Sequence, residues 1–145
     1  MKKLILGTIT ALALTGVMAA DAVNWLTDAV KAQAQAKAEN KLVLLDFTGS
    51  DWCGWCIKLN KEVFSQPEFA DYAKRNLVCV EVDFPMKKKL SAEQKKANDA
   101  LAAKYNIRGY PTIIVLNGEG KKVGELGYMK GGPKKFTAEL DKLRK

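Results

Sequence analysis

The sequence predicts an α/β domain in which a mixed central β-sheet is flanked by helices on both faces. Segments with strand character alternate with segments with helix character, a pattern typical of a sheet covered by helices. Residues 42–45 are a continuous apolar run and residues 112–116 are a second strand of the buried type, as expected for central strands buried on both faces. Residues 117–120, Asn-Gly-Glu-Gly, favour a turn, so an antiparallel hairpin is expected to close the sheet.

The first half of the domain is expected to contain a helix, a strand and two further helical segments. Residues 24–40 are rich in Ala, Gln and Lys and predict a helix capped by Asn24. Its apolar side is expected to contain Trp25, Leu26, Ala29, Val30 and Ala36. A strand over residues 41–47 follows, and a helix should begin at the first cysteine of a close pair and continue through Val63. Pro67 suits the first turn of the next helix.

The second half predicts a strand, a helix, a hairpin and a terminal helix. Residues 77–84 alternate between two faces, with Val78, Val80 and Val82 together on one of them. Ser91 followed by Gln94 is a capping-box pattern that opens a helix to about Tyr105. Residues 112–116 and 121–127 should pair as the hairpin. The terminal helix is expected to turn Phe136, Leu140 and Leu143 inward.

The N-terminal segment, residues 1–20, has the pattern of a secretory signal peptide. Lys2 and Lys3 precede an apolar run over residues 4–17, and residues 17–19 or 20–22 would suit cleavage. The run is shorter than the ~20 apolar residues that a membrane-spanning helix needs. We therefore expect residues 21–145 to form one exported domain, periplasmic or secreted, without stable insertion in a membrane.

Composition excludes several classes of function. The chain contains no histidine, which removes Ser-His-Asp and Cys-His hydrolysis and every histidine-ligated metal site. The formal net charge is +8, and +6 (22 − 16) without Lys2 and Lys3. The lysines are spread along the chain without interleaved aromatic residues, so a basic solvated surface is expected rather than nucleic-acid binding. We expect a monomer.

Cys53 and Cys56 enclose Gly54 and Trp55 between a buried strand and a helix. At a helix start, unpaired N–H groups and the positive end of the dipole favour a thiolate at Cys53, the attacking species in disulfide exchange. Cys56 lies one turn further on, close enough to close a small ring with Cys53 and to resolve a mixed disulfide. The motif predicts a redox pair that needs no bound cofactor.

Other interpretations of the cysteines stay open. The pair could be half of a zinc site, but only Cys79 and carboxylates remain as further ligands, so no metal is expected. It could also be a permanent disulfide, which constrains little entropy in so short a loop, or a chance pairing. Cys79 falls in a predicted strand and is expected to be a small buried hydrophobe, with a third redox thiol as the alternative.

A second signal is Pro111, at the mouth of a buried strand. Its missing N–H and the option of a cis bond after Tyr110 suit a special backbone geometry, although a simple strand-start proline is the alternative. Four stretches, residues 44–47, 52–56, 82–83 and 105–112, together resemble the thioredoxin superfamily. The resemblance extends in consistent order from about residue 24 to the C-terminus and implies a thioredoxin fold.

The resemblance also implies roles for three residues in the chemistry. Cys53 matches the exposed nucleophile and Cys56 the buried resolving cysteine. Asp46 matches the buried acid that accepts or relays the proton of Cys56. A carboxylate within an apolar strand is costly to bury, so its pKa should be raised. An aspartate that only caps the following loop is the alternative.

The residues expected to contact substrate surround the pair: Trp52, Gly54, Trp55, Tyr110 and Pro111. By resemblance, the backbone before Pro111 pairs with a substrate strand and Trp52 flanks the motif. Trp55 stands where thioredoxins have proline, and it either contacts substrate or is an exposed aromatic residue without a role.

The expected function is exchange of thiols and disulfides with other exported proteins, with an unidentified redox partner resetting the pair. The loop over residues 47–52 is one residue longer than in ordinary thioredoxins and is similar to that of exported reductants. This similarity favours a reductant. A disulfide oxidant or isomerase and a non-catalytic peptide-binding module remain alternatives. The Lys-rich segment after Asp83 is either a partner-facing elaboration or only a longer helix.

Overall fold

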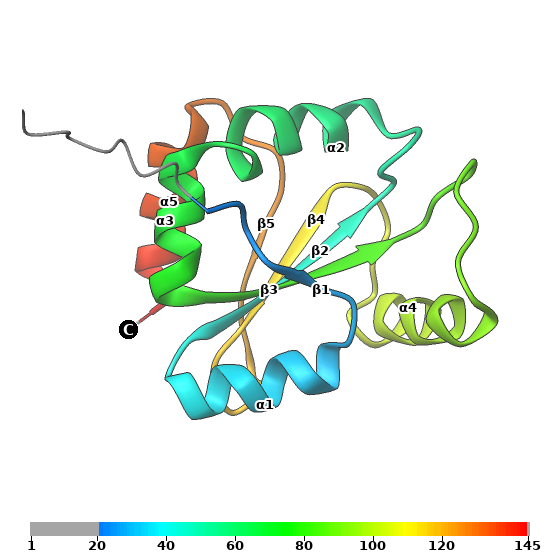
Figure 1. Cartoon of the computed structure of the whole chain (residues 1–145), viewed down its shortest axis with the longest axis horizontal. Helices are drawn as coiled ribbons and strands as arrows, with labels where there is room; N and C mark the ends of the chain where they lie inside the picture. Colours follow the sequence, from blue (N-terminus) through cyan, green and yellow to red (C-terminus); the bar gives the residue numbers. More distant parts are fainter. Residues whose placement is uncertain (1–20, 145) are drawn as a thin grey trace, which may run out of the picture.

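The computed structural model describes residues 21–144, which form a five-stranded sheet in the order β1-β3-β2-β4-β5 (Figure 1). The strands are β1 (Trp25–Leu26), β2 (Leu42–Thr48), β3 (Leu77–Asp83), β4 (Thr112–Leu116) and β5 (Lys122–Leu126). β3 pairs in parallel with β1 and β2, whereas β4 pairs antiparallel with β2 and β5. This is the predicted mixed sheet with its closing hairpin. The expected signal peptide, residues 1–20, lies outside the described residues.

Helices cover both faces of the sheet, as expected for a thioredoxin fold (Figure 1). One face carries α1 (Ala29–Glu39) and α4 (Ala92–Lys104). The other carries α2 (Gly54–Leu59), the π-helical turn η1 (Asn60–Phe64), α3 (Pro67–Asn76) and α5 (Gly132–Lys142). No helix in the described part of the chain is long and apolar enough to cross a bilayer.

Alternation along β2 decides which side of the sheet receives each side chain. Leu42 and Leu44 pack in the core under α3 and α5, whereas Val43, Leu45 and Phe47 pack in the core under α1. Asp46 therefore points to the same face as Leu44, towards α2. Burial of the strand on both faces explains its continuous apolar run.

The predicted start of the first helix was wrong. Asp28, not Asn24, is the N-cap of α1, and its carboxylate accepts hydrogen bonds from the N–H groups of Val30 and Lys31. Trp25 and Leu26 precede the helix and pair with the edge of β3 as β1. Val30, expected on the apolar side, is exposed, whereas Ala36 is buried as expected, together with Ala32.

The remaining elements follow the predictions closely. The Ser91 hydroxyl caps α4 by accepting from the N–H of Gln94, but the Gln94 amide donates to Thr27 and Asn98 rather than closing the capping box. The helix predicted from the first cysteine through Val63 is divided, because its last turn has π geometry over η1. Phe136 and Leu140 of α5 are fully buried, and Leu143 packs against the same core.

Candidate active site

Cys53 and Cys56 form a disulfide at the N-terminus of α2, with their Cα atoms 5.2 Å apart. Cys53 is the N-cap residue of the helix, and its sulfur accepts a hydrogen bond from the N–H of Cys56 at 3.2 Å. The first-turn amide therefore faces the Cys53 sulfur as the sequence predicted. Cys53, expected to be the exposed cysteine, is buried in the oxidised pair almost as fully as Cys56, with 7% against 4% exposed.

Space is open on the solvent side of the disulfide. Apart from its chain neighbours and the backbone of α2 itself, a Cβ atom added at Gly54 would have no atom within 4 Å. Gly54 and Trp55 are both exposed between the two buried cysteines. The surface formed by these two residues is therefore open to solvent.

Asp46 lies on the opposite, buried side of the pair. It is 8% exposed, and its Oδ1 atom is buried with no hydrogen-bond partner. Burial, together with the negative charges of Glu81 and Asp83, raises the pKa of this carboxyl to about 8. Since a buried carboxylate without partners is costly, the protonated form is favoured at neutral pH. Its geometry does not fit a loop cap, because the carboxylate bonded to Ser50 is that of Asp83.

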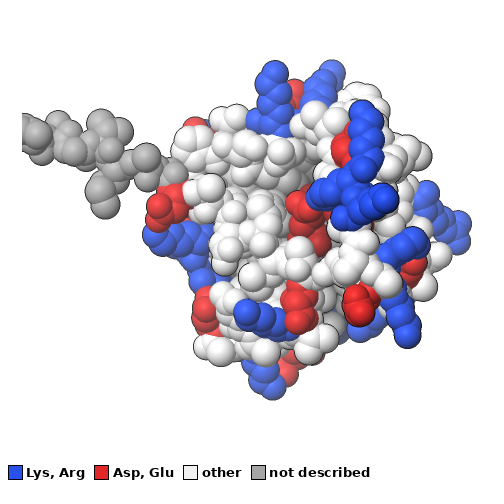
Figure 2. Space-filling view, turned by 45° about the vertical axis from the view of Figure 1, so that its right-hand side comes forward, with Lys and Arg blue, Asp and Glu red and all other residues white. Residues whose placement is uncertain are grey.

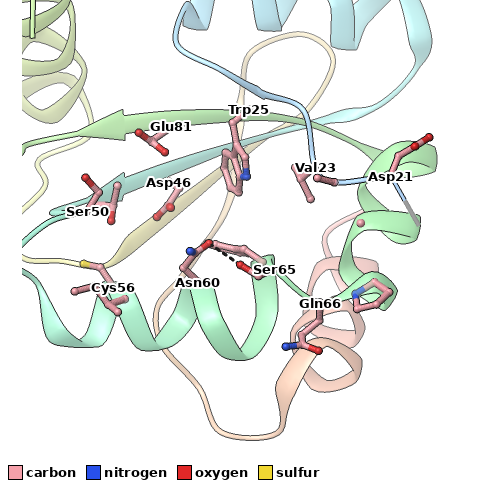
Figure 3. A pocket seen from close by; sticks show the side chains of 16 residues that line it. Asp21, Val23, Trp25, Asp46, Ser50, Cys56, Asn60, Ser65, Gln66 and Glu81 are labelled. Atoms are coloured by element: carbon pink, nitrogen blue, oxygen red, sulfur yellow. Dashed lines mark hydrogen bonds between the residues drawn. The ribbon is translucent and has the colours of Figure 1, made fainter. Parts of the chain in front are cut away.

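A cavity of about 580 Å³ connects Asp46 with Cys56 and the surface (Figure 3). Asp46 extends from β2 into this cavity, and Glu81 approaches from β3, its partner in the parallel register. Cys56 lines the same cavity from α2, and exposed residues such as Ile57 and Ser65 lie at its rim. Water can therefore reach the Asp46 carboxyl without crossing the exposed face of the disulfide.

The structure brings Trp52 and Tyr110 together on the exposed side of the site. Their rings meet edge to face with centroids 5.9 Å apart, and Trp52 remains 41% exposed. The Trp52 indole N–H donates to the carbonyl of Phe84 at 2.7 Å. The peptide bond between Tyr110 and Pro111 is cis, as expected from the resemblance, and leads directly into β4.

Trp55 lies against a residue that the sequence analysis missed. Its ring is 5.0 Å from that of Tyr128, and the Lys58 ammonium lies 5.2 Å and 5.3 Å from the two ring centroids. The Tyr128 hydroxyl donates to Glu62 at 2.7 Å, which fixes the ring. Trp55 is nevertheless 57% exposed, so it presents an apolar surface next to the disulfide. Tyr128 follows the last strand, and no local pattern predicts this contact.

The third cysteine is separate from the disulfide. Cys79 is free and buried in β3, and burial raises the pKa of its thiol, with the Asp46 charge as a second cause. It packs in the core as the sequence analysis expected of a small hydrophobe. Over residues 21–144, no group of three or more Cys, Asp or Glu side chains is arranged to hold a metal ion.

Two further carboxylates, Asp51 and Asp83, were not among the predicted site residues. Asp51 accepts hydrogen bonds from the N–H groups of Met86, Lys87 and Lys88. Asp83 accepts from the N–H and the hydroxyl of Ser50. These bonds join the loop before Cys53 to the loop after β3. The two loops lie far apart in the chain, so sequence periodicity could not reveal the bonds.

Comparison with known proteins agrees with this site and fold. A family model described as a thioredoxin-like domain matches residues 29–144. Disulfide bond reductase DsbH of Chlamydia pneumoniae is 36% identical over 110 residues, which are 76% of this chain and 66% of that protein. Thioredoxin-related protein DsbJ of the same species is 33% identical over 107 residues, 74% of this chain and 31% of that protein.

A solved structure of DsbH oxidoreductase superimposes with a TM-score of 0.84 at 33% identity and covers 94% of both chains. The chain spans just under two thirds of the curated DsbH sequence and less than a third of DsbJ. The family model, the DsbH structure and the disulfide at the start of α2 all indicate a thioredoxin-like domain. The chain belongs to the thioredoxin-like family.

Proposed function

We propose that the chain is an exported thiol:disulfide oxidoreductase that reduces disulfides of other exported proteins. The observation that carries the proposal is the disulfide at the start of α2, where the Cys53 sulfur accepts the N–H of Cys56. The same amide and helix dipole would stabilise a Cys53 thiolate once the pair is reduced.

The reaction cycle follows from the order of the two cysteines. In the reduced protein, the Cys53 thiolate attacks a substrate disulfide, forms a mixed disulfide and releases one substrate thiol. Cys56 then attacks the Cys53 sulfur, which breaks the mixed disulfide and releases the second thiol. The Cys53–Cys56 disulfide remains, so two electrons have passed to the substrate. A separate dithiol redox partner must reduce the pair again before the next cycle.

Asp46 is proposed to accept the proton of Cys56 when that thiol becomes the attacking group. With a pKa of about 8, Asp46 is mostly protonated at neutral pH, so the ionised minority of molecules accepts the proton of Cys56 and this fraction grows as the pH approaches 8. The cavity that Asp46 shares with Cys56 offers the proton a path to solvent on the side away from bound substrate.

On the exposed side, Trp52, Gly54, Trp55, Tyr110 and the cis Pro111 are proposed to receive the substrate chain. Two features support this assignment: the open space over Gly54 and the exposed aromatic rings of Trp52 and Trp55. An extended substrate could pair with the backbone before Pro111, because the entrance to a strand offers unpaired polar groups.

Two observations support the reductive direction and export. The relative DsbH is named a disulfide bond reductase, and residues 1–20 of this chain have the pattern of a signal peptide. We expect a reduction potential near the value of about −270 mV known for thioredoxin, rather than the value of about −120 mV known for DsbA. Equilibration with defined thiol and disulfide buffers, read by mass spectrometry, gives this potential.

The test of the exchange mechanism is the variant Cys56→Ser, presented with a protein disulfide. It should form a stable mixed disulfide through Cys53, seen as a covalent adduct that dithiothreitol releases. The double variant Cys53→Ser/Cys56→Ser should form none, and Cys79→Ser should behave like the unmodified protein because Cys79 is buried in the core. Reversible binding of the partner without any covalent adduct would instead assign the chain to non-catalytic peptide binding.

A further inference from the structure

The loop between β3 and α4 is fixed to the active-site loop by Asp51. The Asp51 carboxylate accepts hydrogen bonds from three consecutive N–H groups, at 2.9 Å from Met86 and 2.8 Å from both Lys87 and Lys88. These backbone donors, led by that of Lys88, lower the pKa of Asp51 below its usual value. Asp51 lies two positions before Cys53, so the loop is anchored directly beside the nucleophile.

In a second set of hydrogen bonds, the active-site loop supplies the donors and the end of β3 supplies the acceptor. Asp83, 3% exposed at the end of β3, accepts from the N–H and hydroxyl of Ser50 and from the Lys88 ammonium at 2.9 Å. The Trp52 indole adds a bond to the Phe84 carbonyl. We call the bonds made by Asp51, Asp83 and Trp52 the clasp. These bonds tie the two loops to each other beside Cys53.

The clasp presents a ridge, residues 86–89, of which all four residues are exposed. Met86 is 75% exposed although it is apolar. The ion pairs with Asp83 and Glu81 offset the charge of Lys88, whereas Lys87 and Lys89 have no carboxylate within 4.0 Å among the residues that the structure describes. Within residues 21–144, Lys87 and Lys89 thus follow an exposed, adaptable apolar side chain without an ion pair of their own, and the nearest negative charge is that of Asp51, which binds the Lys87 N–H.

A further exposed aromatic side chain connects the surroundings of the ridge with those of the disulfide. Trp52, the residue before Cys53, is exposed and bonds the carbonyl of Phe84, two positions before the ridge. On the side of the molecule that Figure 2 brings forward, several basic side chains project from the surface, with acidic side chains between them. A polypeptide that reaches Cys53 along this side meets apolar surface and positive charge together, and complementary charge would speed and orient its approach.

We propose that residues 86–89 are a docking ridge that selects protein partners carrying acidic residues next to their reactive cysteine or disulfide. The clasp holds the ridge at a fixed position relative to Cys53, so charge recognition is coupled to thiol–disulfide exchange. This inference rests on the proposed function, and it adds a substrate class that the cysteine pair alone does not specify. An anionic membrane is the less favoured binding partner, because binding to lipid would not require the ridge to be held at a fixed position relative to Cys53.

The test compares reduction of three substrates by the full-length reduced protein. Two are synthetic peptides with one disulfide and the same length, with either aspartate or lysine beside the cysteines, and the third is a small uncharged disulfide. We expect kcat/KM for the acidic peptide to exceed that for the basic peptide about tenfold at low salt. The preference should decline towards 1 M salt, where the screening length is about 3 Å.

The decisive variant is Lys87→Glu/Lys89→Glu, which should abolish or reverse the preference and leave reduction of the uncharged disulfide unchanged. Its matched control is Lys31→Glu/Lys121→Glu, which makes the same change in net charge. Lys31 lies in α1, and Lys121 follows the hairpin turn that Gln33 of α1 bonds, so both are away from Cys53. The control should keep the preference for the acidic peptide.

Asp51→Asn tests the clasp. Removal of the carboxylate charge and of one acceptor oxygen should speed hydrogen exchange at the amides of residues 86–88 and weaken the preference for the acidic peptide. A preference that persists while those amides exchange faster would contradict the clasp as the positioning device.

Other outcomes overturn the proposal in distinguishable ways. If the uncharged disulfide is reduced but the peptides do not differ, the docking ridge is wrong and the proposed function stands. If no disulfide is reduced, the proposed function itself fails. If the protein binds vesicles with anionic lipid, loses this binding in Lys87→Glu/Lys89→Glu and shows no peptide preference, the ridge binds membranes instead.

Discussion

Asp46 and Asp83 are two buried carboxylates on neighbouring strands and the same face of the sheet, yet their surroundings differ. Asp83 accepts hydrogen bonds from Ser50 and forms an ion pair with Lys88. Asp46 has an oxygen without any partner and a pKa raised to about 8. A buried acid whose bonds are satisfied fixes a loop, whereas a buried acid left unpaired beside a thiol is suited to hold and release a proton.

The largest expected effect separates the two acids by activity. Asp46→Asn should lower the rate of disulfide reduction at pH 7 about 100-fold, because Cys56 loses its proton acceptor. Asp83→Asn should change the rate per folded molecule far less. Stopped-flow reduction of a small uncharged disulfide measures both variants. A rate for Asp46→Asn within twofold of the unmodified protein would contradict the role proposed for Asp46.

The second effect separates them by stability. Asp83→Asn should lower the free energy of unfolding by about 2 kcal/mol, because charged hydrogen bonds to Ser50 and Lys88 are weakened. Ser50→Ala, which removes only the hydroxyl partner, should lose about 1 kcal/mol. Urea denaturation of the oxidised proteins gives these values. An unchanged midpoint for Asp83→Asn would mean that the clasp does not stabilise the fold.

The third effect is the pH dependence that Asp46 imposes on the oxidised protein. Its pKa rises from 3.8 in the unfolded chain to about 8 when folded, so between these values only the folded state holds the proton. Stability from this group is complete below the unfolded pKa and is lost as pH rises through the folded pKa. The loss is about 1.4 kcal/mol per pH unit between pH 5 and 7.

Urea denaturation at a series of pH values checks this slope. Asp46→Asn should remove it and should be more stable than the unmodified protein at pH 9, where the latter buries an ionised carboxylate. Equal pH dependence in the two proteins would show that Asp46 ionises normally in the folded state.

The smallest effect concerns Glu81, the partner of Asp46 in the register of β2 and β3. Glu81→Gln should lower the pKa of Asp46 modestly, because burial is the larger cause of the shift and the Glu81 charge the next. The decline in the free energy of unfolding with pH, which ends near the folded-state pKa of Asp46, should therefore end at a lower pH. Glu119→Gln, which changes an exposed charge in the hairpin turn, is the matched control and should leave it unmoved.

Local patterns predicted much of this molecule. Period-2 alternation placed Val78, Val80 and Val82 on one face of β3, and the apolar run around Asp46 predicted its burial and raised pKa. The spacing of Cys53 and Cys56 predicted a ring that the disulfide now closes. These predictions succeeded because each depends on residues within a few positions of one another.

The missed features depend on contacts between distant segments. Trp25 was assigned to a helix because its neighbours favour one, yet pairing with the edge of β3 determines its conformation. The bonds of Asp51 to residues 86–88 and the contact of Trp55 with Tyr128 join segments that lie far apart in the sequence. Composition and periodicity do not carry this information, because polar loop residues look alike whether they bond water or another loop.

The most direct test of the difference between the two acids is a titration of the aspartate carboxyl carbons by NMR in the oxidised protein. We expect one resonance to shift near pH 8 and to be absent from Asp46→Asn, which would identify it as the unpaired acid behind the cysteine pair. If the resonance missing from that variant titrates near the ordinary value of about 4 instead, Asp46 is ionised at neutral pH and the proton transfer proposed here is wrong.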